Sequence, residues 1–208
     1  MKIFLGSLIG IILTNIFNRL SIANKLNNYR KLILKYNDEI ALPKSTAYIL
    51  DFDKTKFYIL NYYSIVFEKN NFNGKVQRTY DTMPMFNSEI YKSIPSEYLF
   101  RIFTVRNDYS KFIDIIYSID YLKENLPLNI STDFTEQVKE HISYKNLKPE
   151  ETTEHFKNCS FLEENTDLYI SKITNYTKRA NSLKNELNEI NLNLNGHSTY
   201  WLFRYIFN

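Results

Sequence analysis

Apolar residues recur at alternating spacings of four and three residues in two long stretches of the chain. The first seam comprises Ile22, Leu26, Tyr29, Ile33, Tyr36 and Ile40. The second seam comprises Tyr169, Ile173, Tyr176, Ala180, Leu183, Leu187, Ile190 and Leu194. This spacing places all members of a seam on one side of a helix, as in coiled coils. We therefore predict two long helices whose seams pack on each other.

The flanking residues set the predicted bounds of these helices. The first is expected over residues 3–41, because Pro43 disfavours helix in the residue before it. The second is expected over 166–195, with Thr166 as a cap at its start and Gly196 as its stop. The fold class that follows is mainly α: a helical bundle with two long heptad-patterned helices and shorter helices between them.

The residues between the seams divide into shorter segments, with prolines at the boundaries. Helices are predicted over 87–94, 97–106, 107–125, 133–147 and 149–161. Residues 45–80 leave two alternatives open. Their aromatic and β-branched residues favour a small β-hairpin around Asn73-Gly74 with arms near 65–72 and 75–80. A helix over 54–68 fits equally well.

Residues 1–20 form the most apolar part of the chain. The stretch from Ile3 to Phe17 carries no charge, and a membrane-spanning helix needs at least about 17 residues. We expect a single-pass anchor here, with a cleaved signal peptide and a helix buried in protein as the alternatives. The basic residues after it place the single helical domain, residues 21–208, on the cytoplasmic side.

Two further sets of residues bear on this anchor. Gly6, Gly10 and Thr14 form a stripe of small residues that predicts helix dimerisation. An aromatic and basic cluster near the C-terminus predicts contact with the membrane interface, docking in the protein's own core being the alternative. That cluster contains Tyr200, Trp201, Phe203 and Arg204.

Composition narrows the function classes. The chain has only four glycines, too few for the glycine-rich loops of nucleotide-binding folds. Its net charge of +3 in 208 residues provides no field that would attract nucleic acid. The single Cys159 excludes an intrachain disulfide framework. We expect no cofactor, no nucleic acid and no small-molecule substrate.

Two groups of residues suggest chemistry. Residues 49–55, ILDFDKT, resemble the nucleophile motif of the haloacid dehalogenase-like phosphatases. That resemblance implies a nucleophilic Asp51, an acid–base Asp53 and a Mg²⁺ ion, but the later motifs of the family are missing. Glu151, His155 and Cys159 follow at steps of four on one helical face and could activate a thiolate. We interpret that row as a solvated helix face.

The three histidines, His141, His155 and His197, are scattered, and no H-x-x-x-H pair or second cysteine accompanies them. We therefore expect no metal site.

The predicted function is a membrane-anchored, non-catalytic interaction, scaffold or sensor protein, with lipid, other proteins or a second copy of itself as partners. The alternative is a soluble helical binding module with a buried N-terminal helix, and a phosphatase-like enzyme using Asp51 and Asp53 is a remote alternative.

Overall fold

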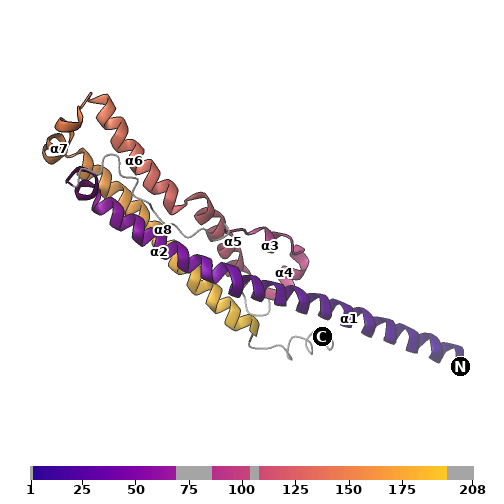
Figure 1. The fold of residues 1–208 in the computed structure, drawn as a ribbon. Helices are drawn as coiled ribbons and strands as arrows, with labels where there is room; N and C mark the ends of the chain where they lie inside the picture. Colours follow the sequence, from indigo (N-terminus) through magenta and orange to yellow (C-terminus); the bar gives the residue numbers. More distant parts are fainter. Residues whose placement is uncertain (1, 69–85, 104–107, 196–208) are drawn as a thin grey trace. The chain divides into compact units, whose positions relative to one another are not determined.

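The computed structural model describes residues 2–68, 86–103 and 108–195, and these ranges contain helices and turns but no strand (Figure 1). The predicted mainly α fold is confirmed. The elements in chain order are α1 (Lys2–Tyr36), η1 (Asn37–Ala41), α2 (Leu42–Leu60), η2 (Ser64–Glu68), α3 (Glu89–Lys92), α4 (Ser96–Phe103), α5 (Tyr109–Glu124), α6 (Pro127–Tyr144), α7 (Pro149–Asn158) and α8 (Phe161–Asn195).

Pro43 does not end the first helical stretch, contrary to prediction. The chain passes from α1 through the π-helical turn η1 directly into α2, in which Pro43 is the second residue. Inside an α-helix, a proline ring clashes with the carbonyl four residues earlier. In the first turn of a helix, proline is tolerated. In η1 the Leu42 N–H bonds the carbonyl of Asn37, one residue further back than in an α-helix. The wider turn therefore lets the helix continue past the proline.

Residues 45–68 are helical, apart from a short turn around Asn61. The first arm of the predicted β-hairpin is therefore wrong for residues 65–68, which belong to η2. The rest of both arms lies outside the described residues. The preference of aromatic residues for strands depends strongly on their surroundings. Here Tyr48, Phe52 and Tyr62 are buried side chains of helical segments.

The prediction of a membrane anchor over residues 1–20, with a cytoplasmic body behind it, is wrong. No helix in the described part of the chain is both long enough and apolar enough to cross a membrane. The uncharged run from Ile3 to Phe17 extends only about 22 Å as a helix, against a hydrocarbon core of about 30 Å. The helix then continues through Asn18 and Arg19, which are polar. The predicted interface residues Tyr200, Trp201, Phe203 and Arg204 lie outside the described residues.

The chain divides into two compact units. Unit 1 comprises Met1–Leu42, Asn87–Tyr117 and Asn185–Asn208, and unit 2 comprises Pro43–Phe86 and Ser118–Lys184. The long helix α8 therefore contributes its C-terminal part to unit 1 and its N-terminal part to unit 2.

In unit 1, α1 lies along the end of α8, as expected from the two seams, and the two helices run antiparallel. Arg30 Nη1 donates a hydrogen bond to the carbonyl of Leu194 at 2.6 Å, and Asn37 Nδ2 donates one to Asn191 Oδ1 at 2.7 Å. Arg30 also places positive charge at the C-terminal end of α8, where the helix dipole favours it. The buried seam residues of this unit are Leu26, Ile33, Tyr36, Leu187, Ile190 and Leu194, whereas Ile22, Tyr29 and Ile40 are half-buried.

A chain of hydrogen-bonded polar side chains leads through the core of unit 1, where Tyr91, Asn37 and Asn191 are buried, to the exposed Asp38. The Tyr91 hydroxyl donates a hydrogen bond to Asn37 Oδ1, Asn37 donates to Asn191, and Asn191 Nδ2 donates to Asp38 Oδ1 at 2.6 Å. Burial and the neighbouring Tyr36 raise the pKa of Tyr91 well above its usual value. The hydroxyl therefore remains a proton donor to Asn37 at any ordinary pH.

The core of unit 2 is rich in aromatic rings. Phe134 of α6 is fully buried and meets Tyr62 and Tyr169 edge-on, with ring centroids 5.1 and 5.4 Å away. Phe52 stacks on Tyr176 at 5.7 Å. Four seam residues of this unit are buried, namely Tyr169, Ile173, Ala180 and Leu183, and Tyr176 is half-buried.

Candidate functional site

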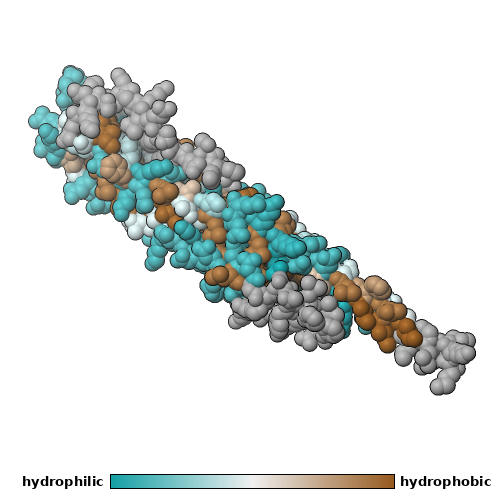
Figure 2. Space-filling view, turned by 60° about the horizontal axis from the view of Figure 1, so that its bottom comes forward, coloured by the Kyte–Doolittle hydropathy of each residue, from teal (hydrophilic) through white to brown (hydrophobic). Residues whose placement is uncertain are grey.

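Two features of the described chain are unexplained by folding alone, and the first is an apolar surface on α1. The apolar side of α1 comprises Ile9, Ile12, Leu13, Ile16 and Leu20, which follow one another at helical spacing. Their exposed fractions lie between 38% and 51%, and the neighbouring Phe17 is 66% exposed. Figure 2 shows hydrophobic side chains gathered on this part of α1. This segment is therefore not buried by the described chain, and the alternative of a buried N-terminal helix requires a partner that covers it.

The apolar side of α1 continues the buried seam of the same helix. Ile9, Ile12 and Ile16 lead at steps of three and four, through the half-buried Arg19, to Ala23 and Leu26. Ala23 and Leu26 are 4% and 2% exposed. The helix thus presents apolar residues on one side both before and after Arg19, and only those after Arg19 are covered.

The predicted dimerisation stripe lies beside this face. A Cβ atom added at Gly10 would have no neighbour within 4 Å, so the helix is open there. The Thr14 hydroxyl donates a hydrogen bond to the Gly10 carbonyl at 2.8 Å. Gly6 belongs to the same helix. The stripe is sterically free at Gly10, and the dimerisation that it predicts stays a prediction.

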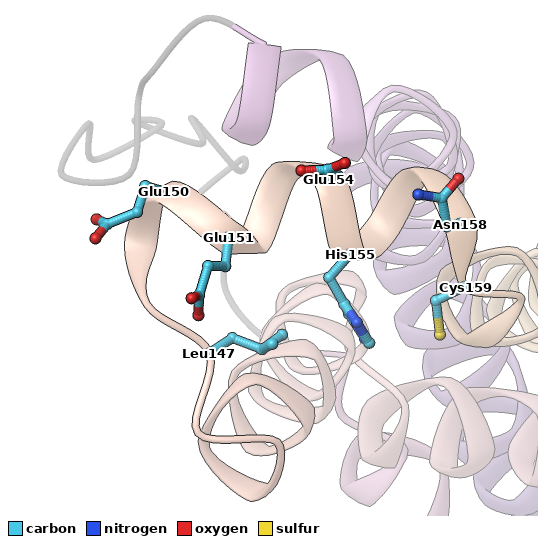
Figure 3. A pocket seen from close by; sticks show the side chains of 7 residues that line it. All are labelled: Leu147, Glu150, Glu151, Glu154, His155, Asn158 and Cys159. Atoms are coloured by element: carbon cyan, nitrogen blue, oxygen red, sulfur yellow. The ribbon is translucent and has the colours of Figure 1, made fainter.

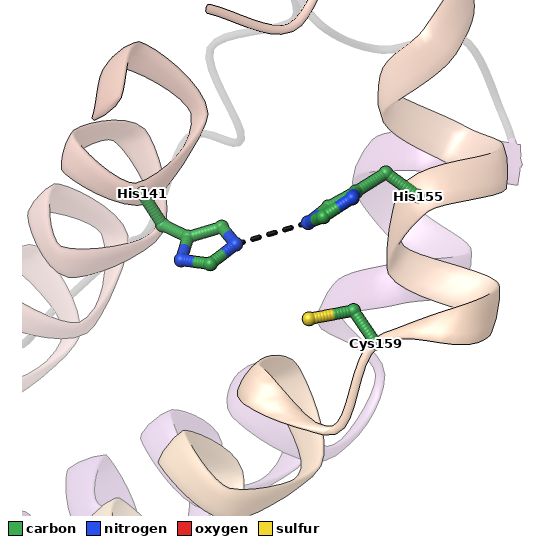
Figure 4. Close-up of side chains that lie close together, drawn as sticks. All are labelled: His141, His155 and Cys159. Atoms are coloured by element: carbon green, nitrogen blue, oxygen red, sulfur yellow. Dashed lines mark hydrogen bonds between the residues drawn. The ribbon is translucent and has the colours of Figure 1, made fainter. Parts of the chain in front are cut away.

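The second feature is the His–Cys cluster, formed by His141, His155 and Cys159 in unit 2 (Figure 4). His141 lies in the last turn of α6, His155 lies on α7, and Cys159 follows the last residue of α7. The two Nε2 atoms are 3.0 Å apart, so that one nitrogen donates its proton to the other. One nitrogen of each imidazole and the Cys159 sulfur all lie within 4.8 Å of one another.

Aromatic packing holds the imidazole rings in place. The His141 ring stacks on Phe161 of α8, with ring centroids 3.9 Å apart and planes 16° from parallel. Phe156, which is buried, meets the His155 ring edge-on at 5.3 Å. Burial, followed by the positive charges that His155 and Lys145 can carry, lowers the pKa of His141. The neutral imidazole, which can act as a ligand, is thereby favoured.

A cavity of about 570 Å³ borders the His–Cys cluster (Figure 3). Figure 3 shows Glu151, His155 and Cys159 on the same side of α7, while Glu154 lies on another side. Glu151 Oε2 accepts a hydrogen bond from the Lys148 N–H at 3.1 Å. The residues Glu151, His155 and Cys159, spaced at steps of four, therefore all line this cavity from one side of α7.

The sequence indicated only part of this cluster. The helical spacing placed His155 and Cys159 together, but fourteen residues and a helix-to-helix turn separate His141 from His155. That turn contains Asn146 with φ of 49°, a left-handed conformation that asparagine adopts more readily than most residues. Asn146 lies inside the helix predicted over 133–147, so this reversal was not anticipated from the sequence. His197 lies outside the described residues.

Asp51 and Asp53 occupy the middle of helix α2. In the phosphatase motif that residues 49–55 resemble, the two aspartates follow a strand and point into one site. Here Asp51 is buried and pairs with Lys54 Nζ at 2.9 Å, whereas Asp53 is exposed. Burial and the Asp51 charge raise the pKa of the neighbouring Tyr48 to about 12. The helix separates the two carboxylates rather than bringing them together.

Comparison of the chain with protein-family models, with curated proteins and with solved structures found no match.

Proposed function

We propose that the chain is a non-catalytic protein-interaction module, which pairs through the apolar side of α1 with the same side of a second copy. The observation that carries this proposal is the register of Ile9, Ile12 and Ile16 with the buried residues further along the helix. One side of α1 is buried over half its length and exposed over the other half. Such a pattern is expected where a partner covers the exposed half.

The energetics of burial support such an association. Burying a Leu, Ile or Phe side chain completely contributes about 1.5–3 kcal/mol. A symmetric pair buries the apolar side of α1 twice, so that ten side chains contribute against the cost of association. A second copy also brings a helix with the same apolar periodicity. Matching periodicity lets the side chains of one helix fit between those of the other.

The stripe beside this face adds a steric argument. Small side chains let two helix backbones approach closely, and Gly10 has open space around it. The Thr14 hydroxyl already donates to the Gly10 carbonyl, so it loses no hydrogen bond when water leaves the interface. Gly6, Gly10 and Thr14 can therefore lie at the edge of a helix pair without a desolvation penalty from that hydroxyl.

Sedimentation velocity of the purified full-length chain over a range of concentrations tests this proposal. The unaltered chain is expected to dimerise reversibly. The double variant Ile12→Ser/Phe17→Ser should weaken dimerisation about 100-fold or more, since four large side chains per dimer are lost and each 1.4 kcal/mol is a factor of about ten.

The matched control is Leu50→Ser/Phe57→Ser, which removes similar side chains from α2. Leu50 and Phe57 are 56% and 66% exposed, close to the 51% and 66% of Ile12 and Phe17. This control should leave the dissociation constant unchanged. A full-length chain that stays monomeric at every concentration, or a control that dissociates as readily as the test variant, contradicts the proposal.

A further inference from the structure

We propose that His141, His155 and Cys159 form a binding site for a thiophilic transition-metal ion, with Zn²⁺ as the ion that the donor set fits. The inference concerns unit 2 alone and does not depend on association through α1. It runs against the expectation of no metal site, which rested on the separation of the histidines along the sequence.

The spacing of the donor atoms is close to that of a tetrahedral zinc site. Zn–N bonds of about 2.0–2.1 Å and Zn–S bonds of about 2.3 Å separate neighbouring tetrahedral ligands by about 3.3–3.6 Å. The two Nε2 atoms are 3.0 Å apart, and all three donor atoms lie within 4.8 Å of one another. Figure 4 shows both ring nitrogens and the Cys159 sulfur directed toward the same space. Side-chain adjustments of about one ångström are sufficient to admit the ion.

The cluster is held by three different elements, which limits its freedom. Stacking of His141 on Phe161 orients the first imidazole from the side of α8. His155 and Cys159 are four residues apart, so α7 and its end present both side chains on one side. A binding site whose ligands are already oriented loses little conformational entropy when the ion binds.

The chemistry of the donors selects the ion. Imidazole nitrogens and a thiolate suit Zn²⁺ and other soft or borderline ions, whereas Mg²⁺ and Ca²⁺ prefer oxygen ligands. Zinc sites with three protein ligands hold a fourth ligand, often water. The adjoining cavity of about 570 Å³ provides room for it, and Glu151 lines that cavity on the same side of α7.

Metal binding at this place would join the end of α6, α7 and the start of α8. Because the ion binds the folded unit with all three ligands together, it should stabilise that unit against unfolding. The metal therefore acts as a structural clamp at one end of unit 2.

Titration of the full-length chain with Zn²⁺ in competition with a chromophoric chelator, under a phosphine reductant, tests the site. One ion per chain is expected, together with a higher melting temperature. Co²⁺ should give intense visible absorption typical of tetrahedral coordination and a thiolate charge-transfer band in the near ultraviolet. A chain that binds no Zn²⁺, or a Co²⁺ spectrum without the thiolate band, overturns the inference.

Variants distinguish the cluster from adventitious binding. Cys159→Ser removes the sulfur, and His141→Phe removes a nitrogen while it keeps a ring against Phe161. Each should weaken Zn²⁺ binding about 100-fold or more, since even residues behind the ligands change metal affinity 10–100-fold. Glu154→Gln is the matched control, because Glu154 lines the same cavity but lies on another side of α7. Equal affinity of all three variants contradicts the site.

Alkylation of the single cysteine provides a test that needs no substitution. Zn²⁺ should slow modification of Cys159 by iodoacetamide in the unaltered chain, and a chelator should restore the rate. Circular dichroism of each metal-free variant separates loss of a ligand from loss of the fold. If Zn²⁺ leaves the rate of Cys159 alkylation unchanged, the sulfur is not a ligand and the inference fails.

Discussion

Phe134→Ala is expected to lower the free energy of unfolding by about 3–5 kcal/mol, the usual cost of removing a fully buried phenylalanine. The Phe134 side chain is 0% exposed and lies between the rings of Tyr62 and Tyr169. The loss combines the transfer energy of the ring, the cavity left behind and two edge-to-face contacts, each contributing about 0.5–1.5 kcal/mol. The hydrogen bond from the Tyr169 hydroxyl to Asp133 holds that ring in place, so the cavity cannot close easily.

Urea unfolding followed by circular dichroism measures this effect. Phe57→Ala is the control, since it makes the same chemical change at a side chain that is 66% exposed. It should change the free energy of unfolding by less than about 0.5 kcal/mol. If the two variants proved equally stable, Phe134 would not lie in the core of unit 2.

Asn191→Leu is expected to cost about 2–4 kcal/mol, although leucine has nearly the same shape as asparagine. Asn191 accepts a hydrogen bond from Asn37 and donates one to Asp38. The substitution leaves the buried Asn37 amide without that acceptor and Asp38 without that donor. An unsatisfied buried polar group such as the Asn37 amide costs about 1–3 kcal/mol, and the lost hydrogen bond to the exposed Asp38 carboxylate adds to that cost.

Two further variants isolate the contribution of the network. Asn188→Leu makes the same change at an exposed position on α8 and should leave the free energy of unfolding nearly unchanged. The double variant Asn37→Leu/Asn191→Leu should cost less than the sum of the single variants, because each single variant leaves the partner unsatisfied. Strict additivity in urea unfolding would show that the two side chains do not interact.

The two long helices could be predicted because their apolar periodicity is a property of the chain itself. Every second-seam residue is buried except Tyr176, which is half-buried. The errors arise where neighbours decide the outcome. The π-turn η1 carries the helix into α2 and past Pro43, an outcome that the proline rule for helix ends does not give. Phe52 of α2 stacks on Tyr176, a contact that strand propensity does not take into account. The anchor was predicted from the lack of charge in residues 3–17, although this run is shorter than a spanning segment.

The His–Cys cluster shows the limit of spacing rules. His155 and Cys159 could be placed together because one helix carries both. His141 joins them only because the chain reverses between α6 and α7, and no local pattern gives the distance between two helices after a turn. The apolar side of α1 is a local pattern, by contrast, because steps of three and four lead from the buried Leu26 and Ala23 through Arg19 to the exposed Ile16, Ile12 and Ile9.

We propose that the exposed apolar side of α1 binds a second copy of the chain. Hydrogen exchange of the backbone amides, measured at low and high protein concentration, tests it most directly. We predict that protection increases with concentration in the segment from Ile9 to Leu20, while the segment around Leu50 and Phe57 shows no change. Exchange in residues 9–20 that is independent of concentration, or protection that rises equally in both segments, would contradict the account.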